Sequence, residues 1–130
     1  MSGLLSHEKA GESPPTGPAH HYAQLLARLE DLEGYSHAAL LQYPKLERHL
    51  LCAEIRQSLN KIQRLTITAW KRYHKQSTLK DLDVEIEVLR GWIRKSLRLQ
   101  YINAHRYQVW SEHVGQIGRM VGGWLKAAQK

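Results

Sequence analysis

Apolar residues recur every three or four positions through four successive stretches of the chain. The clearest stripe consists of Cys52, Ile55, Leu59, Ile62, Thr66, Ala69 and Tyr73. This spacing places the stripe on one face of an α-helix, and such a face must be buried against another element. A chain of 130 residues has room for one hydrophobic core, so the four stretches are predicted to pack around a single core.

Turn-forming and capping residues separate the four predicted helices. The first is expected from about residue 20 to 41, and the second from Pro44 to about Lys75. Pro44 suits the first turn of a helix, because its missing N–H has no partner there. Thr78, followed three residues later by an aspartate, resembles a capping box and predicts the start of the third helix. Asn103 is the predicted cap of the fourth.

The third helix competes with another interpretation of the same residues. Residues 81–88 alternate acidic and apolar side chains, which by itself is typical of a β-strand. A lone strand would have no sheet to join. The helix is favoured because one stripe continues through this stretch, comprising Leu82, Ile86, Leu89, Ile93 and Leu97. Acidic residues early and basic residues late in this helix also match its dipole.

These elements predict an all-α fold. Short connections place consecutive helices side by side in opposite directions, so residues 19–130 are expected to form an antiparallel up-down four-helix bundle. Residues 1–18 are rich in Gly, Ser and Pro and lack hydrophobic periodicity. We expect this segment to be a flexible N-terminal tail.

Positive charge is concentrated in the later part of the chain. Residues 43–130 hold seventeen Lys and Arg against seven Asp and Glu, whereas residues 1–42 hold two against five. Within this basic region Arg90, Arg94 and Arg98 are four residues apart on one helix face, where like charges repel by roughly 0.2–0.5 kcal/mol per pair. A fold gains nothing from this arrangement, so the arginines indicate an anionic partner such as nucleic acid or an acidic protein.

The second predicted helix carries a cationic ridge of its own, on a face separate from its apolar stripe. Together with the arginines it is expected to form one surface able to neutralise several phosphates. The alternative is an ordinary solvated face. From charge geometry, the candidate contacts for nucleic acid or a protein partner are Lys61, Arg64, Lys71, Arg72, Lys75, Arg90, Arg94, Lys95 and Arg98.

Aromatic and basic residues alternate between Trp70 and Lys75. Surfaces that stack unpaired bases often combine these residue types. However, Tyr73 lies on the apolar stripe and Trp70 flanks it, so the favoured expectation is that both rings are buried.

Small residues form a second stripe on the fourth predicted helix, namely Ser111, Gly115, Gly118 and Gly122. A glycine inside a helix costs about 0.8–1.0 kcal/mol relative to alanine, so three of them indicate close approach of another helix. That helix belongs either to the same bundle or to another subunit. Because the apolar stripe already faces the bundle core, contact between subunits is slightly favoured.

No pattern in the chain predicts catalysis, a metal site or a cofactor. The eight histidines lack the Glu-x-x-His spacing of di-metal bundles, and no phosphate loop or nucleophile elbow occurs. The single cysteine, Cys52, excludes an intramolecular disulfide and is expected to be a small buried apolar residue. No signal peptide or membrane-spanning stretch is recognisable, so a soluble cytoplasmic protein is expected.

Three segments resemble the accessory variability determinant (Avd) family of diversity-generating retroelements, within a wider group of four-helix-bundle proteins. They are Tyr43-Pro44-Lys45-Leu46-Glu47-Arg48, Arg72-Tyr73-His74-Lys75-Gln76-Ser77-Thr78-Leu79-Lys80-Asp81-Leu82-Asp83 and Gly115-Gln116-Ile117-Gly118-Arg119-Met120-Val121-Gly122-Gly123-Trp124. The likeness covers about two thirds of the chain. Tyr43 replaces a common phenylalanine, and Gln116 replaces a common acidic residue.

The resemblance implies a noncatalytic accessory protein that assembles as a homopentamer with a basic surface. Members bind the retroelement's reverse transcriptase together with RNA and cDNA, and they support mutagenic reverse transcription. The alternative for this chain is a related bundle that docks an acidic protein partner and has no part in reverse transcription.

Overall fold

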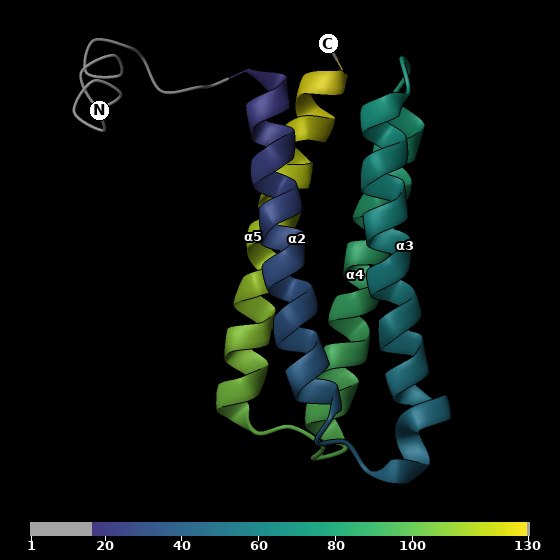
Figure 1. Ribbon diagram of the computed structural model, residues 1–130, viewed down its shortest axis with the longest axis vertical. Helices are drawn as coiled ribbons and strands as arrows, with labels where there is room; N and C mark the ends of the chain where they lie inside the picture. The colour runs from purple at the N-terminus through teal and green to yellow at the C-terminus, as the bar shows by residue number, and fades with distance from the viewer. Residues whose placement is uncertain (1–16, 130) are drawn as a thin grey trace, which may run out of the picture.

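A computed structural model describes residues 17–129, which form four long α-helices and one short 3₁₀-helix. The elements are α2 (Pro18–Leu40), η1 (Lys45–His49), α3 (Leu51–Lys71), α4 (Gln76–Arg98) and α5 (Ala104–Ala128). The helices run alternately up and down along one long axis (Figure 1). This confirms the predicted all-α, antiparallel four-helix bundle. The predicted tail lies outside the described residues except for Gly17 and Pro18, and Pro18 already belongs to α2.

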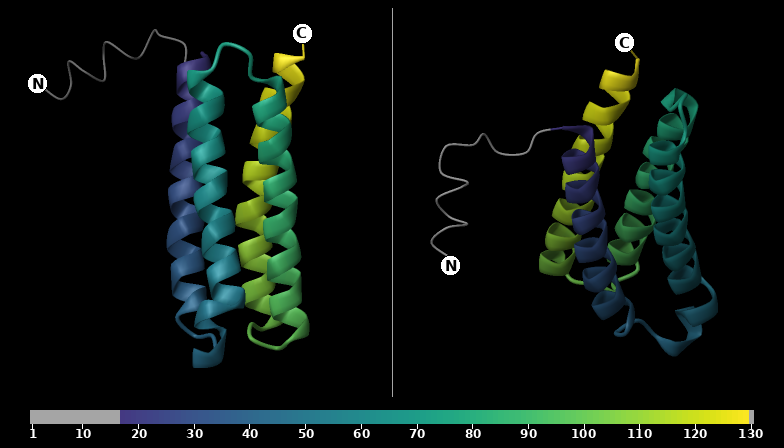
Figure 2. Two further views of the ribbon diagram at one scale, coloured as in Figure 1. Left: turned by 90° about the vertical axis from the view of Figure 1, so that its right-hand side faces the viewer. Right: turned by 45° about the horizontal axis from the view of Figure 1, so that its top comes forward.

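The four helices are not packed equally tightly around the axis. α3 packs closely on α4, α4 on α5, and α5 on α2, whereas α2 and α3 contact one another only sparsely. Figure 2 shows the α2–α5 pair and the α3–α4 pair diverging toward the end that holds the α3–α4 turn and the C-terminus. The α2–α3 seam is therefore the least closed side of the bundle.

One continuous core fills the bundle and draws on every long helix. Ile55, Leu82 and Ile117 are each 1% exposed or less, and Trp110 is fully buried. The Trp110 indole N–H donates to the Ser36 hydroxyl at 2.8 Å, so the largest core side chain carries no unpaired polar group. The predicted apolar stripes thus supply the core.

A buried polar contact sets the register between α3 and α4. Glu85 is only 9% exposed; it accepts a 2.5 Å hydrogen bond from Ser58 Oγ and lies 3.5 Å from Lys61 Nζ. A buried carboxylate must be paired to be tolerated. The acidic residues of this helix were expected to lie early in it and to match its dipole, but the first turn of α4 contains no acidic residue.

The second predicted helix is shorter than expected at both ends. Pro44 does not begin an α-helix; it precedes η1, and Leu50 (φ −115°, ψ −103°) separates η1 from α3. At the other end α3 stops at Lys71, so Tyr73 leaves the helix and is 90% exposed. The prediction that Tyr73 is buried was wrong, because the apolar stripe ends with the helix.

The start of α4 also differs from its prediction. α4 begins at Gln76 and has no side-chain cap, and Thr78 is buried inside the helix, so the capping box was wrong. A hydrogen bond of 2.9 Å from the Leu79 N–H to the Lys75 carbonyl extends the helix by nearly a turn. The choice of helix over strand was confirmed. The Asn103 cap was also confirmed, since its side chain accepts from the Arg106 N–H at 2.8 Å.

Glu47 joins three elements at the end of the bundle opposite the α3–α4 turn. Its carboxylate accepts from the Tyr101 hydroxyl at 2.5 Å and from the Leu51 N–H at 3.2 Å. The hydrogen bond from Tyr101 holds the pKa of Glu47 below its ordinary value of 4.5, and the same bond raises the pKa of Tyr101 above 10.0. The charged carboxylate and the neutral phenol are therefore the forms that folding favours.

The turn that presents Tyr101 is built around Gln100. Its φ of 65° lies in the left-handed region, where glycine is the usual residue after a helix. The Gln100 N–H bonds the Leu97 carbonyl and the Tyr101 N–H bonds the Ser96 carbonyl, both at 3.0 Å. These two bonds form a Schellman motif, which fixes the position of Tyr101 relative to η1.

We predict that Tyr101→Phe lowers the melting temperature most at neutral pH. Stabilisation through Glu47 is present above pH 4.5 and is lost as pH falls through its lower folded pKa. Stabilisation through Tyr101 is present below pH 10.0 and is lost as pH rises through its higher folded pKa. Thermal unfolding followed by circular dichroism across this range measures the effect.

Tyr107→Phe is the matched control for this prediction. Tyr107 is also partly buried, and its hydroxyl makes no hydrogen bond to the described residues. A difference between Tyr101→Phe and the parent protein that stayed constant from acid to neutral pH would contradict a linkage through Glu47.

Candidate functional site

Arg90 begins the arginine stripe on α4 and lies against α5. Its Nη2 is 2.6 Å from the position that a β-carbon on Gly118 would occupy, and its Nε is 3.3 Å from Glu87 Oε1. The side chain is only 33% exposed. Much of the Arg90 side chain is therefore buried in the contact between α4 and α5.

The other cations of α4 are more accessible. Arg94 and Arg98 follow Arg90 at four-residue intervals, so they share its flank of the helix, and both are exposed. Lys95 is exposed as well, and its Nζ lies 5.6 Å from the centre of the Trp92 ring, within the range of a cation–π contact. No carboxylate of the described residues lies within 4 Å of these three cations.

The cations of α3 and the following turn form a second group. Arg64, Lys71 and Arg72 are exposed, and no described carboxylate lies within 4 Å of them. Lys61 is different because it contacts the buried Glu85, although its side chain remains 64% exposed. Three of the four thus keep a charge that nothing in the described fold neutralises.

Lys75 has a structural task that its sequence position did not reveal. Its ammonium donates to the carbonyl oxygens of Ala69 at 2.9 Å, Trp70 at 3.0 Å and Arg72. These carbonyls belong to the end of α3, where the helix itself offers no N–H partners. Lys75 thus terminates α3, and its three donors are occupied within the protein.

The two groups of cations lie on different flanks of α4. Glu85 faces α3 through Ser58 and Lys61, whereas Arg90 faces α5 through Gly118. Five residues correspond to a rotation of about 140° around a helix. The arginine stripe thus borders the α4–α5 groove and the α3 cations border the opposite side. A partner that contacts both groups has to span the outer face of α4, on which Lys95 is exposed.

The aromatic part of the Trp70–Lys75 run is divided by the end of α3. Tyr73 is exposed, whereas Trp70 is partly buried and stacks on Tyr22 of α2, with ring centres 4.4 Å apart and an interplanar angle of 7°. The sequence did not predict the contact between Tyr22 and Trp70, because the spacing of residues within one helix does not indicate which ring of another helix they contact.

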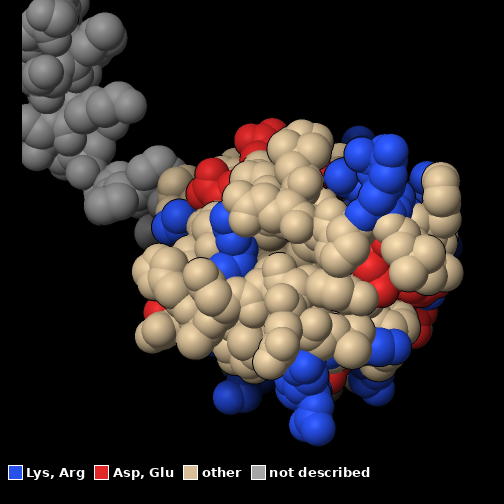
Figure 3. Space-filling view, turned by 90° about the horizontal axis from the view of Figure 1, so that it is seen from below, with Lys and Arg blue, Asp and Glu red and all other residues tan. Residues whose placement is uncertain are grey.

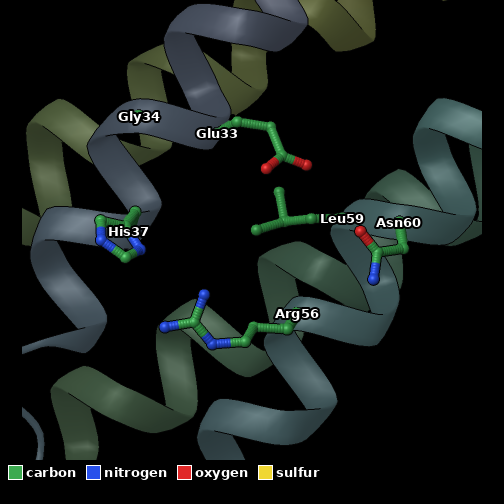
Figure 4. Close-up of a pocket in the computed structure, with 6 residues that line it drawn as sticks. All are labelled: Glu33, Gly34, His37, Arg56, Leu59 and Asn60. Carbon is green, nitrogen blue, oxygen red and sulfur yellow. The ribbon is translucent and has the colours of Figure 1, made fainter.

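A depression between α2 and α3 has a volume of about 400 Å³. Figure 4 shows Glu33 and His37 of α2 and Arg56 and Asn60 of α3 around it, with Leu59 between them. These charges are of mixed sign and lie at the edge of a sparsely packed seam. We assign this depression to the loose α2–α3 contact.

The end of the bundle near η1 exposes apolar side chains. Leu41, Leu46, Leu50 and Leu99 are between 46% and 77% exposed; we call them the leucine end face. Figure 3 views this end and shows uncharged residues over much of it, with Lys and Arg and also some Asp and Glu toward its edge. Contiguous exposed apolar surface with a polar rim is typical of protein–protein contacts.

The small-residue stripe of α5 changes character along the helix. Gly115 is buried and Gly118 is half-buried against Arg90, whereas Gly122 is exposed and has open space where a β-carbon would be. Ser111 and Gly115 line a shallow groove together with Arg90 and Arg119. Part of the stripe therefore serves packing within the chain, and Gly122 is the member that remains free of it.

Residues 17–129 contain no recognisable metal site and no helix that could span a membrane. No three His, Cys, Asp or Glu side chains of this range gather where they would hold a metal ion. None of its helices combines the length and apolar character needed to cross a bilayer. Cys52 is buried as expected, and burial raises the pKa of its thiol, which keeps the thiol protonated and unreactive.

Comparison with known proteins agrees with the resemblance found in the sequence. No protein with a curated functional description matches the chain. The model of the bAvd-like family, however, matches residues 24–128, which includes all of α3, α4 and α5 and most of α2. A match of this extent covers the whole bundle core and both groups of cations, so the chain belongs to the bAvd-like family of accessory proteins.

Proposed function

We propose that this protein is a noncatalytic accessory of a diversity-generating retroelement, which binds RNA and cDNA beside a reverse transcriptase in the cytoplasm. One observation carries the proposal: six exposed cations of the two groups described above have no carboxylate within 4 Å among the described residues. They are Arg64, Lys71, Arg72, Arg94, Lys95 and Arg98. Repelling charges of this kind cost folding free energy, and a polyphosphate relieves that cost.

The α4 cations provide the sharpest test. We predict that the double reversal Arg94→Glu and Arg98→Glu weakens RNA binding while leaving helicity intact, because neither side chain contributes an ion pair to the fold. Losing two phosphate contacts should also make the plot of log affinity against log salt less steep, by about 1.5 in slope. Fluorescence anisotropy with labelled RNA at several salt concentrations measures both effects.

Lys45→Glu combined with Lys126→Glu gives a control with the same change in net charge. Both residues are exposed, lie outside the two cationic groups and have no described carboxylate within 4 Å. If this control and the α4 double variant weakened binding equally, net charge would explain the effect. RNA binding that survived the α4 reversal at low salt would remove Arg94 and Arg98 from the interface.

The leucine end face supports the part of the proposal that concerns a protein partner. Apolar surface is what a protein contact buries and what a polyphosphate does not need. The exposed cations would also suit an acidic partner unrelated to reverse transcription, which is the second candidate function. A reverse transcriptase gene with paired template and variable repeats beside this gene would favour the first candidate, and its absence the second.

We predict that Leu46→Glu reduces co-purification with the polymerase encoded beside this gene. Leu46 is 77% exposed, so the substitution should not disturb the core. Val84→Glu is the matched control, since Val84 is 61% exposed and lies within α4, away from this end. Equal recovery of the polymerase with Leu46→Glu and with the parent protein would exclude the leucine end face as its contact.

We further propose that the protein forms a homo-oligomer, pentameric as the family resemblance implies, through the small-residue stripe. Gly118 is a poor test position, because a larger side chain there displaces Arg90 within the same chain. Gly122→Leu meets open space and improves helix propensity. We therefore predict a lower mass by light scattering for Gly122→Leu, with retained helicity.

An unchanged mass for Gly122→Leu would assign the stripe to packing inside one chain. Gly34→Leu is the control, because Gly34 is also an exposed helical glycine with open space around it, and it lies on α2.

A further inference from the structure

An apolar groove of about 690 Å³ opens at the end of the bundle where α2 begins and α5 finishes. It lies between the first turns of α2, the last turn of α3 and the last turns of α5. This volume falls within the range of sites that hold small organic ligands. Its main side chains are Tyr22, Leu25, Trp70, Met120 and Trp124.

Three aromatic rings from three different helices form the wall of this groove. Tyr22 stacks on Trp70 at 4.4 Å, and Trp124 meets Tyr22 edge-on, with ring centres 6.3 Å apart and planes inclined by 62°. All three rings are only partly buried. Tyr22 and Trp70 belong neither to the hydrophobic core nor to the side chains packed on it, so their aromatic surface is not needed to close the bundle.

Apart from Tyr22, the ionisable side chains around the groove are all of basic residues. His21, Lys75 and Arg119 line it, and no Asp or Glu does. Arg119 is exposed and has no described carboxylate within 4 Å. The ammonium of Lys75 donates to backbone carbonyls and lies beside the Trp70 ring, 5.8 Å from the ring centre. The groove thus matches a flat apolar group that carries a negative charge.

We propose that this groove binds an unpaired nucleobase of single-stranded RNA, with the adjacent phosphate directed toward Arg119. Aromatic rings accept bases by stacking in a manner that tolerates any sequence, and a neighbouring arginine holds the backbone. A duplex keeps its bases stacked on one another and cannot offer them to the groove. The inference rests on the proposed function and adds a preference for unpaired nucleotides, which the cationic groups alone do not supply.

The test fills the groove without touching the rings. Gly123 lines the groove, is exposed and has open space where a β-carbon would be. Gly123→Leu therefore inserts a side chain into the groove, and it raises helix propensity, so the fold should be retained. Gly34→Leu makes the same substitution on α2, away from the groove, and is the matched control. Circular dichroism checks both variants.

Each protein is titrated with labelled single-stranded RNA of about ten nucleotides and with a blunt RNA duplex of the same length. Gly123→Leu should weaken single-strand binding about five- to tenfold, since a stacked base contributes about that factor or more. Its duplex affinity should equal that of the parent protein. Arg119→Gln should weaken single-strand binding more than duplex binding, and it provides a second variant that cannot disturb the core.

Other outcomes overturn the inference. Parent-like single-strand affinity in Gly123→Leu would show that the groove is not used, as would be the case if it is covered by residues 1–16 or by a second copy of the chain. Equal weakening of single strand and duplex would remove the preference for unpaired bases. Failure of the proposed function is distinct, because it appears as RNA binding that ignores Arg94→Glu with Arg98→Glu, whatever Gly123→Leu does.

Discussion

Burial of one apolar stripe from each helix is the interaction on which the rest of this structure depends. A fully buried Leu or Ile side chain contributes about 1.5–3 kcal/mol, and the core includes Ile55, Leu79, Leu82, Leu89 and Ile117, each 1% exposed or less. An exposed ion pair contributes about 0–1 kcal/mol, and the described residues contain three ion pairs. Stability therefore resides inside the bundle, which leaves most of the charged surface available for a partner.

Polar contacts set several of the helix ends around this core. Lys75 ends α3 by bonding its last carbonyls, and Glu47 ties η1 to the start of α3 and to the turn before α5. Glu85 fixes how α3 and α4 are aligned. The consequence for function is selective. Lys75 and Arg90 contribute contacts to the fold, whereas Arg94, Lys95 and Arg98 remain exposed on α4.

Helical periodicity was sufficient to predict the bundle, because stripes such as that of α3 repeat over many turns and outweigh local ambiguities. Helix ends were predicted less well. Some helix ends are set by contacts between residues distant in sequence, such as Glu47 and Tyr101. Others depend on a backbone bend that helix propensities do not predict, as at Leu50. For the candidate site, charge identified the cations. Sequence could not indicate that Arg90 and Lys61 point to different flanks, nor that Trp70 meets Tyr22.

The sparse contact between α2 and α3 has a mechanical consequence. At one end α2 and α3 are joined through η1, and Glu47 bonds Tyr101, whereas at the other end no stretch of chain joins these two helices (Figure 2). There the stack of Tyr22 on Trp70 spans the seam. Any change in the angle between the two helix pairs would displace their free ends most, so this stacked pair is the contact most sensitive to how far the bundle is open.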